Sequence, residues 1–122
     1  MALGKLDQKK FPFFRETTSA GASDIFDNYG CYGILTLEVS GATAISLKVQ
    51  GCINVEDGDK KPIPEEDLEW TDMALINAGD FSVSSSASAN GVYSVGISGL
   101  TKIRVVIDSV SGAATVIGVM EA

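Results

Sequence analysis

Residues 91–119 alternate apolar and polar side chains in three short runs, divided at Ser98-Gly99 and Ser111-Gly112. The residues that share the apolar parity are Tyr93, Val95 and Ile97, then Ile103, Val105 and Ile107, then Thr115, Ile117 and Val119. A period of two with β-branched side chains on one parity is typical of half-buried strands. We therefore predict three consecutive strands in which these residues face a core.

Residues 31–52 predict a β-hairpin. The same alternation runs through residues 31–40 and 43–52, and Gly41-Ala42 lies between them as the expected turn. The residues that we expect to face inward are Leu35, Leu37, Val39, Ile45, Leu47 and Val49.

Shorter apolar segments at residues 70–76 and 81–85 predict further strands on either side of a turn at residues 77–80. No segment is predicted as a helix. The pattern indicates an all-β fold, a single antiparallel β-sandwich of jelly-roll or immunoglobulin-like type with about eight strands. A chain of 122 residues is sufficient for one such domain, which we place at residues 16–122.

Residues 1–15 are polar and basic except for the aromatic cluster Phe11-Pro12-Phe13-Phe14. A proline inside the cluster argues against a regular helix. The segment is either an edge strand whose rings cap this domain's own core, or an extended arm whose rings need a hydrophobic surface on a neighbouring subunit. The arm is our working hypothesis, with Phe11, Phe13, Phe14 and Arg15 as subunit or capsid contacts. On this hypothesis the sandwich folds without residues 1–14.

Residues 53–69 are predicted to form a long exposed acidic loop. The slightly longer segment 53–72 holds eight of the sixteen acidic residues, and a loop of this length is uncommon without a role or disorder. Asp57-Gly58-Asp59 offers clustered carboxylates of the kind that Ca²⁺ prefers, but the EF-hand spacing is absent and two lysines follow at once. We expect a solvated loop and no metal site.

The formal net charge of −7 argues against nucleic acid and anionic membranes as partners, because both require clustered Lys and Arg. No apolar run approaches the length of a membrane-spanning helix. The N-terminus carries charges where a signal peptide has its apolar segment. The sequence therefore predicts a protein made and used without secretion through a membrane, either a cytosolic protein or one that leaves the cell only when the cell lyses.

Two cysteines, Cys31 and Cys52, lie at the open end of the predicted hairpin. Cys31 shares the parity of Leu35, whereas Cys52 has the opposite parity to Val49, so in a regular ladder the two sulfur atoms would project to opposite faces. Free thiols are favoured, and a bulge at Gly51-Cys52 would permit a disulfide.

The sequence contains no histidine and no nucleophile elbow, phosphate-binding loop or dinucleotide fingerprint. We expect neither an enzyme nor a cofactor. Exposed aromatic rings such as Trp70 and Tyr32 could stack on a sugar, although a single Trp in a small sandwich is more often a core or core-edge residue. Arg104 should point outward from its strand, either in a salt bridge on the solvent face or in a subunit contact.

Several longer segments of the sequence resemble known proteins. They are the segment LTLEVSGATAISLKVQGC, the strand Glu69-Trp70-Thr71-Asp72-Met73 after the acidic insertion, and the strands that begin at Gly91-Val92-Tyr93 and Gly99-Leu100-Thr101. With the N-terminal KFPFFRETTSAGASD, they resemble small β-sandwich virion proteins of tailed bacteriophages and prophages. The resemblance covers most of the chain.

This resemblance implies a virion component without catalytic residues, assembled in the host bacterial cytoplasm. The expected role is a capsid decoration or head-associated protein, present as a homo-oligomer in contact with a major capsid or tail protein. The alternatives are a tail-associated protein and a carbohydrate-binding module used in host attachment.

Overall fold

Two long strands, β4 (Ile34–Cys52) and β9 (Lys102–Glu121), pair antiparallel from end to end and organise the sheet. The computed structural model describes residues 8–122. The other strands in this part of the chain are β1 (Gln8–Thr17), β2 (Gly21–Ala22), β3 (Phe26–Asp27), β5 (Thr71–Asp72), β6 (Leu75–Asn77), β7 (Val83–Ser84) and β8 (Gly91–Gly96). The predicted all-β, antiparallel fold is confirmed, as a single open sheet.

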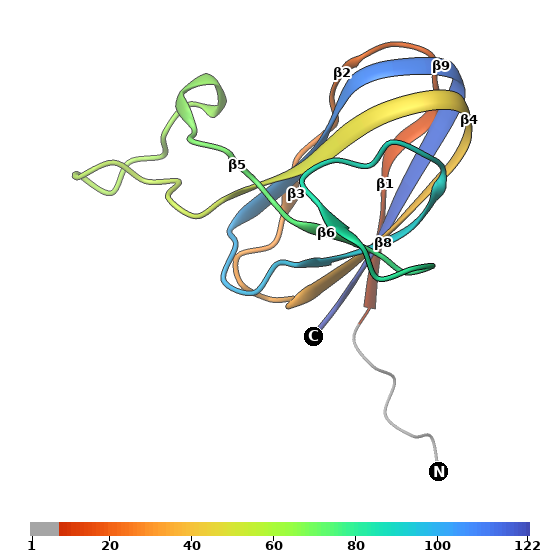
Figure 1. Ribbon diagram of the computed structural model, residues 1–122. Coiled ribbons are helices and arrows are strands. Elements are labelled where there is room, and N and C mark those ends of the chain that lie inside the picture. The colour runs from red at the N-terminus through yellow and green to blue at the C-terminus, as the bar shows by residue number, and fades with distance from the viewer. Residues whose placement is uncertain (1–7) are drawn as a thin grey trace.

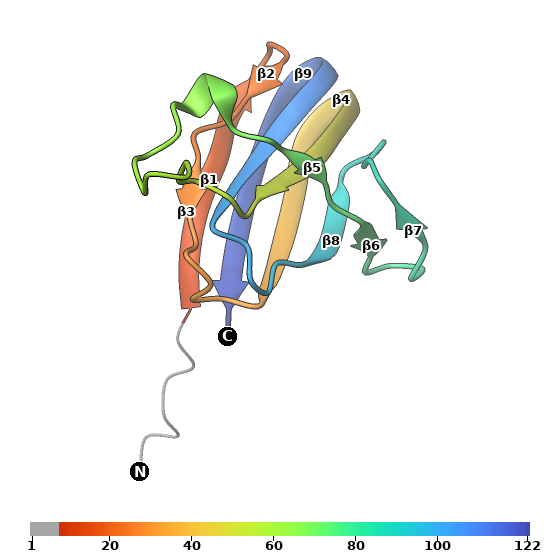
Figure 2. The ribbon, with the colours of Figure 1, turned by 90° about the vertical axis from the view of Figure 1, so that its left-hand side faces the viewer.

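The sheet folds over into two layers because β4 and β9 arch in the middle (Figure 1). The first layer contains β1, the second half of β9, the first half of β4, then β8, β6 and β7, in the order visible in Figure 2. The second layer contains the other halves of β4 and β9, flanked by β5 on one side and by β2 and β3 on the other. The core lies between the layers.

The predicted hairpin turn at Gly41-Ala42 is wrong, as is the predicted break at Ser111-Gly112, because β4 and β9 continue through these positions. Gly41 has φ +80° and Gly112 has φ +81°, so both adopt a backbone conformation that other residues avoid. A Cβ on Gly41 would lie 2.5 Å from the Ala113 carbonyl oxygen, and a Cβ on Gly112 would lie 2.9 Å from the Thr43 nitrogen. The two glycines therefore allow the paired strands to bend together at close approach.

The inward parity predicted for the third run is also wrong. The buried residues there are Ala114, Val116, Gly118 and Met120. Between the pairs Leu47–Ile107 and Ser40–Thr115, β9 uses one residue more than β4, with register shifts on the way. Such a bulge transfers every later side chain to the other face. Thr115, Ile117 and Val119 consequently point away from the core.

Elsewhere the predicted parity is confirmed. The six residues of segment 31–52 that were predicted to face inward are all buried. The predicted inward residues of segments 93–97 and 103–107 are buried as well. Tyr93 is buried among them and its hydroxyl donates a hydrogen bond of 2.7 Å to the Ala89 carbonyl. The sandwich core is thus built from the strands that the alternation identified.

The aromatic N-terminal segment is part of the sheet. Residues 8–17 form β1, an edge strand paired with β9, whereas residues 1–7 of the predicted arm lie outside the described residues. Phe13 is 5% exposed, and a Cβ on Gly118 would lie 2.6 Å from its ring. Phe11 and Phe14 are partly buried and pack against the same core. Truncation of residues 1–14 would therefore remove core side chains, contrary to the expectation that the sandwich folds without them.

The helical content of residues 8–122 is one 3₁₀ turn, η1 (Glu65–Asp67), and this part of the chain contains no helix that is long and apolar enough to cross a membrane. Both cysteines are free. Cys31 is exposed, while Cys52 is buried, although its parity differs from that of the core residues of β4. Burial raises the pKa of the Cys52 thiol.

Gly41→Ala should lower the free energy of unfolding by about 3 kcal/mol or more, because it adds a steric clash with Ala113 to the strain of a positive φ. Gly99→Ala is the matched control, since Gly99 has φ +82° but nothing within 4 Å of its Cβ position. It should cost about 1 kcal/mol. Chemical denaturation measures both values, and equal losses would show that the close approach of the strands is unimportant.

A thiol reagent at neutral pH should modify Cys31 rapidly and Cys52 only after unfolding, because burial shields the Cys52 sulfur and raises its pKa. Mass spectrometry should then count one label on the native protein and two in denaturant. Two labels on the native protein at similar rates would contradict the burial of Cys52.

Candidate interaction surfaces

The outer face of the first layer carries apolar side chains across all six of its strands. Residues that pair directly in an antiparallel sheet point to the same face. One continuous register row consists of Lys10, Val119, Thr36, Ser94, Ile76 and Val83. The row on one side of it consists of Pro12, Ile117, Glu38 and Val92, and the row on its other side contains Ile34 and Glu121. We call the apolar members of these rows the apolar face.

Several members of the apolar face are open to solvent. Val83 is 65% exposed, Ile34 48%, and Ile76 and Val92 40% each. A shallow hollow of about 260 Å³ lies on this face, and it is lined by Lys10, Thr36, Glu38, Val92, Ile117 and Val119. Glu38 lies between Ile117 and Val92 in one row, and Thr36 and Ser94 lie between Val119 and Ile76 in the other. Scattered exposed apolar residues are ordinary, but several gathered on one face make it a candidate interaction surface.

The outer face of the second layer has the opposite character, because hydrogen bonds and ion pairs link its charged side chains. Arg104 Nε donates to Gln50 Oε1 at 2.8 Å, and Gln50 Nε2 donates to Asp72 Oδ1 at 2.9 Å. Lys48 Nζ lies 4.0 Å from Asp72 and 3.8 Å from Asp108. This face is well suited to remain in water, so the two faces of the sandwich differ sharply in polarity.

Lys102 and Asp27 extend this paired surface to the edge of the second layer. Lys102 Nζ donates a hydrogen bond to the Asp27 carboxylate, and this bond is the main cause of the raised pKa of Lys102. The ammonium group also lies 5.6 Å from the centre of the Tyr29 ring.

Trp70 and Arg104 hold the base of the acidic loop against the second layer. The Arg104 guanidinium carbon lies 4.3 Å from the centre of the Trp70 ring, a cation–π contact, while its Nε is bound to Gln50. Leu68, just before Trp70, is buried. Beyond these anchors, residues 53–69 project from the sandwich (Figure 1). A cleft of about 320 Å³ separates Glu65 and Glu66 from the segment 22–25, with Arg104 in its lining.

The tip of the acidic loop is ordered by backbone hydrogen bonds. Asp57 Oδ1 accepts from the backbone nitrogens of Asp59 at 2.8 Å and Lys61 at 3.0 Å, and Ile63 N donates to the Val55 carbonyl at 2.9 Å. Asp57 thus stabilises a turn, and within residues 8–122 no group of three or more Cys, Asp or Glu side chains is placed to hold a metal ion.

The sequence-predicted contact residues occupy different places. Phe13 lies in the core, Phe11 and Phe14 lie at its margin, and Arg15 is exposed on β1. Arg104 does point outward, as predicted, but it contacts Trp70 and Gln50 of its own chain.

The two aromatic residues considered for sugar stacking are not brought together. Trp70 lies on the outer face of the second layer over Arg104, whereas Tyr32 packs toward the core, with its ring centre 6.2 Å from that of Phe26. One face of the Trp70 ring is therefore occupied.

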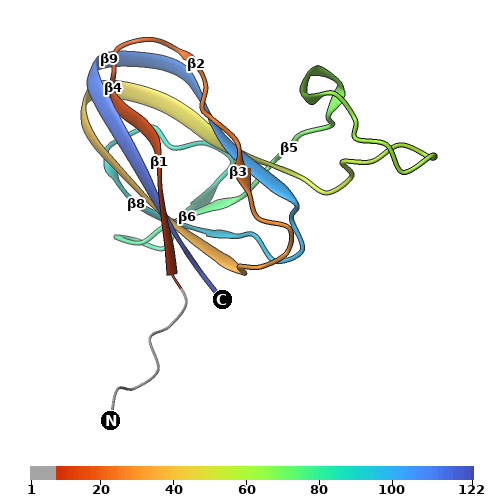
Figure 3. The same ribbon diagram turned by 180° about the vertical axis from the view of Figure 1, so that it is seen from behind.

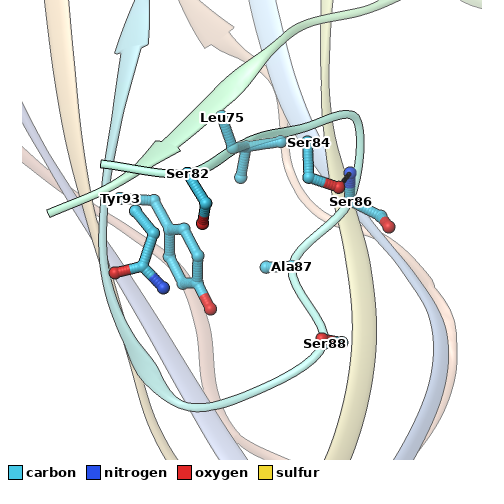
Figure 4. Close-up of a pocket in the computed structure, with 8 residues that line it drawn as sticks. Leu75, Ser82, Ser84, Ser86, Ala87, Ser88 and Tyr93 are labelled. Carbon is cyan, nitrogen blue, oxygen red and sulfur yellow. Dashed lines mark hydrogen bonds between the residues drawn. The ribbon is translucent and has the colours of Figure 1, made fainter. Parts of the chain in front are cut away.

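A small cavity of about 110 Å³ lies beneath the segment that connects β7 to β8 (Figure 4). Leu75 and Tyr93 reach into it, and hydroxyl groups surround it; its lining residues are Leu75, Asn77, Ser82, Ser84, Ser86, Ala87, Ser88 and Tyr93. The Ser82 hydroxyl donates to Asp80 and the Ser84 hydroxyl accepts from the Ser86 nitrogen. No general base lies in this lining, which offers polar packing but no activated nucleophile.

The apolar face was not found from the sequence, although a signal for it exists. Residues 114–120 are apolar or β-branched on both parities, whereas a half-buried strand at a solvated surface alternates with polar residues. The β-branched pattern alone predicts that Ile117 and Val119 face the core, whereas both point outward and are partly exposed.

Arg104→Gln should loosen the acidic loop, because it removes the cation–π contact with Trp70. Trypsin cleavage after Lys60, in the loop, should become about two to five times faster, as expected when a contact of about 0.5–1 kcal/mol is lost from a local opening equilibrium. Lys102→Gln on the same layer is the control and should leave this rate unchanged. An unchanged rate in Arg104→Gln would show that Arg104 does not anchor the loop.

No protein-family model and no curated protein sequence matches the chain. Solved structures that share its fold include two phage-derived proteins. The SPBc2 prophage-derived protein YomS is 26% identical, with a TM-score of 0.78 over 100% of this chain and 99% of that protein. The PBSX exported protein XepA is 19% identical, with a TM-score of 0.75 over 100% of this chain, which spans 40% of XepA. The likeness to YomS supports placing the chain among phage or prophage proteins.

Proposed function

We propose that the protein is a non-enzymatic structural component of a tailed-phage virion that assembles in several copies. Its position on the particle would be the head, as a decoration or head-associated subunit that contacts the major capsid protein. A position on the tail is the alternative. The proposal requires no cofactor and no catalytic residue, and it assigns function to surfaces.

The observation that carries the proposal is the apolar face of the first layer. It extends over six strands, a width of about 24 Å at the usual strand spacing. Val119, Ile117 and Val92 line its hollow, and the charged side chains in its three rows are Lys10, Glu38 and Glu121. Burial of such a face against another protein stabilises an assembly through the hydrophobic effect. The prophage origin of YomS, which shares the fold over its full length, supports a phage particle as the setting.

Val119→Glu should weaken self-association by about tenfold or more while the fold is retained, because it replaces an apolar side chain of the hollow with a second carboxylate beside Glu38. Val106→Glu is the matched control on the outer face of the second layer. Both valines lie on β9 and pair with a lysine, Lys10 or Lys48, and both precede an acidic residue by two positions. Analytical ultracentrifugation measures the association. A monomeric wild-type protein at micromolar concentration, or equal association in both variants, would contradict this use of the apolar face.

The virion location is tested separately in particles purified from an induced lysogen. Quantitative mass spectrometry should find the protein in stoichiometric amount, and gold-labelled antibody should mark the head. Labelling of the tail would establish the alternative, and absence from the particles would refute a structural role in the virion.

A further inference from the structure

The free edge of β1 borders the apolar face and carries unpaired positive charge. β1 is the terminal strand of the sheet, and its exposed cations are Lys9, Lys10 and Arg15. None of the ion pairs between residues 8–122 involves them. We call these three residues the basic edge. Lys10 pairs directly with Val119 of the apolar face, so the two surfaces are continuous.

The basic edge is poorly suited to accept another strand. Pro12 lacks a backbone N–H, and lysines on an edge strand discourage pairing with a second sheet. A partner is therefore expected to contact this edge through side chains, and the charge of the edge selects an acidic one.

The acidic loop supplies such a partner surface. Residues 53–69 contain seven carboxylates and two lysines, and none of the ion pairs between residues 8–122 involves them. The loop is presented in a defined shape, because Asp57 orders its tip and Trp70 stacks on Arg104 at its base. Ile53, beside this charge, is 69% exposed.

A single copy does not pair these charges, because the loop projects on the side of the molecule away from β1 (Figures 1 and 3). We propose that the basic edge and the adjoining apolar face bind the acidic loop of a second copy of this chain. This inference rests on the proposed assembly in several copies and specifies which surface of one copy contacts which surface of the next. Because the loop and β1 lie on different sides of one copy, one partner binds at each side, and the contact is head-to-tail and generates a closed ring or an open filament.

Charge reversal tests the contact. The edge variant Lys9→Glu/Lys10→Glu and the loop variant Glu56→Lys/Asp59→Lys should each weaken self-association by about tenfold or more, because each opposes like charges in the interface. Asp57 is left unchanged because its carboxylate orders the loop. A chain that carries all four substitutions should regain most of the association, since the signs are again complementary. Circular dichroism and thermal unfolding confirm that each variant is folded.

Sedimentation measurements distinguish this contact from the wider proposal. If Val119→Glu weakens association while both charge reversals leave it intact, the apolar face mediates assembly and the head-to-tail contact is wrong. Failure of the four-substitution chain to regain association, with each reversal disruptive, would likewise overturn the pairing of loop and edge. A wild-type protein that is monomeric and absent from particles would instead refute the proposed function. Association of the wild type should also weaken in 1 M salt, where the Debye length is about 3 Å.

Discussion

The fold depends on one close crossing, where β4 and β9 bend together at Gly41 and Gly112. Both residues have positive φ, and a side chain on either would clash with the backbone of the partner strand. The bend turns one sheet into two layers and places the apolar residues of both long strands in the same core. Without the bend, β4 and β9 would form an extended two-stranded ribbon whose apolar side lies open to water.

The same crossing determines what the outer surfaces contain. The extra residue in β9 near the bend changes its parity, so that Ile117 and Val119 point outward on the first layer while Arg104 and Lys102 point outward on the second. One layer thereby presents an apolar face, and the other an ion-paired face that anchors the acidic loop through Trp70. A local irregularity in one strand pair thus produces a molecule with two chemically different sides.

The sequence was sufficient for the fold class and for most of the core, because a period of two identifies strands wherever one face is buried. It was insufficient at Gly41 and Gly112, since a glycine with positive φ is compatible with a turn and with a bent strand alike. The bulge in β9 has no marker in the alternation itself, because residues 114–120 are apolar on both parities. The candidate site was largely missed for this reason, and Trp70 and Arg104 were proposed separately, without their mutual contact.

The central claim is that the apolar face of the first layer is an assembly interface in a phage particle. Cryo-electron microscopy of the native particle tests this most directly, because it shows each copy of the protein and its neighbours. The account predicts that Ile117, Val119 and Val92 are buried against another protein chain, while Lys48 and Asp108 of the second layer face solvent. A particle in which the apolar face is open to water, or in which the second layer forms the contact, would contradict it.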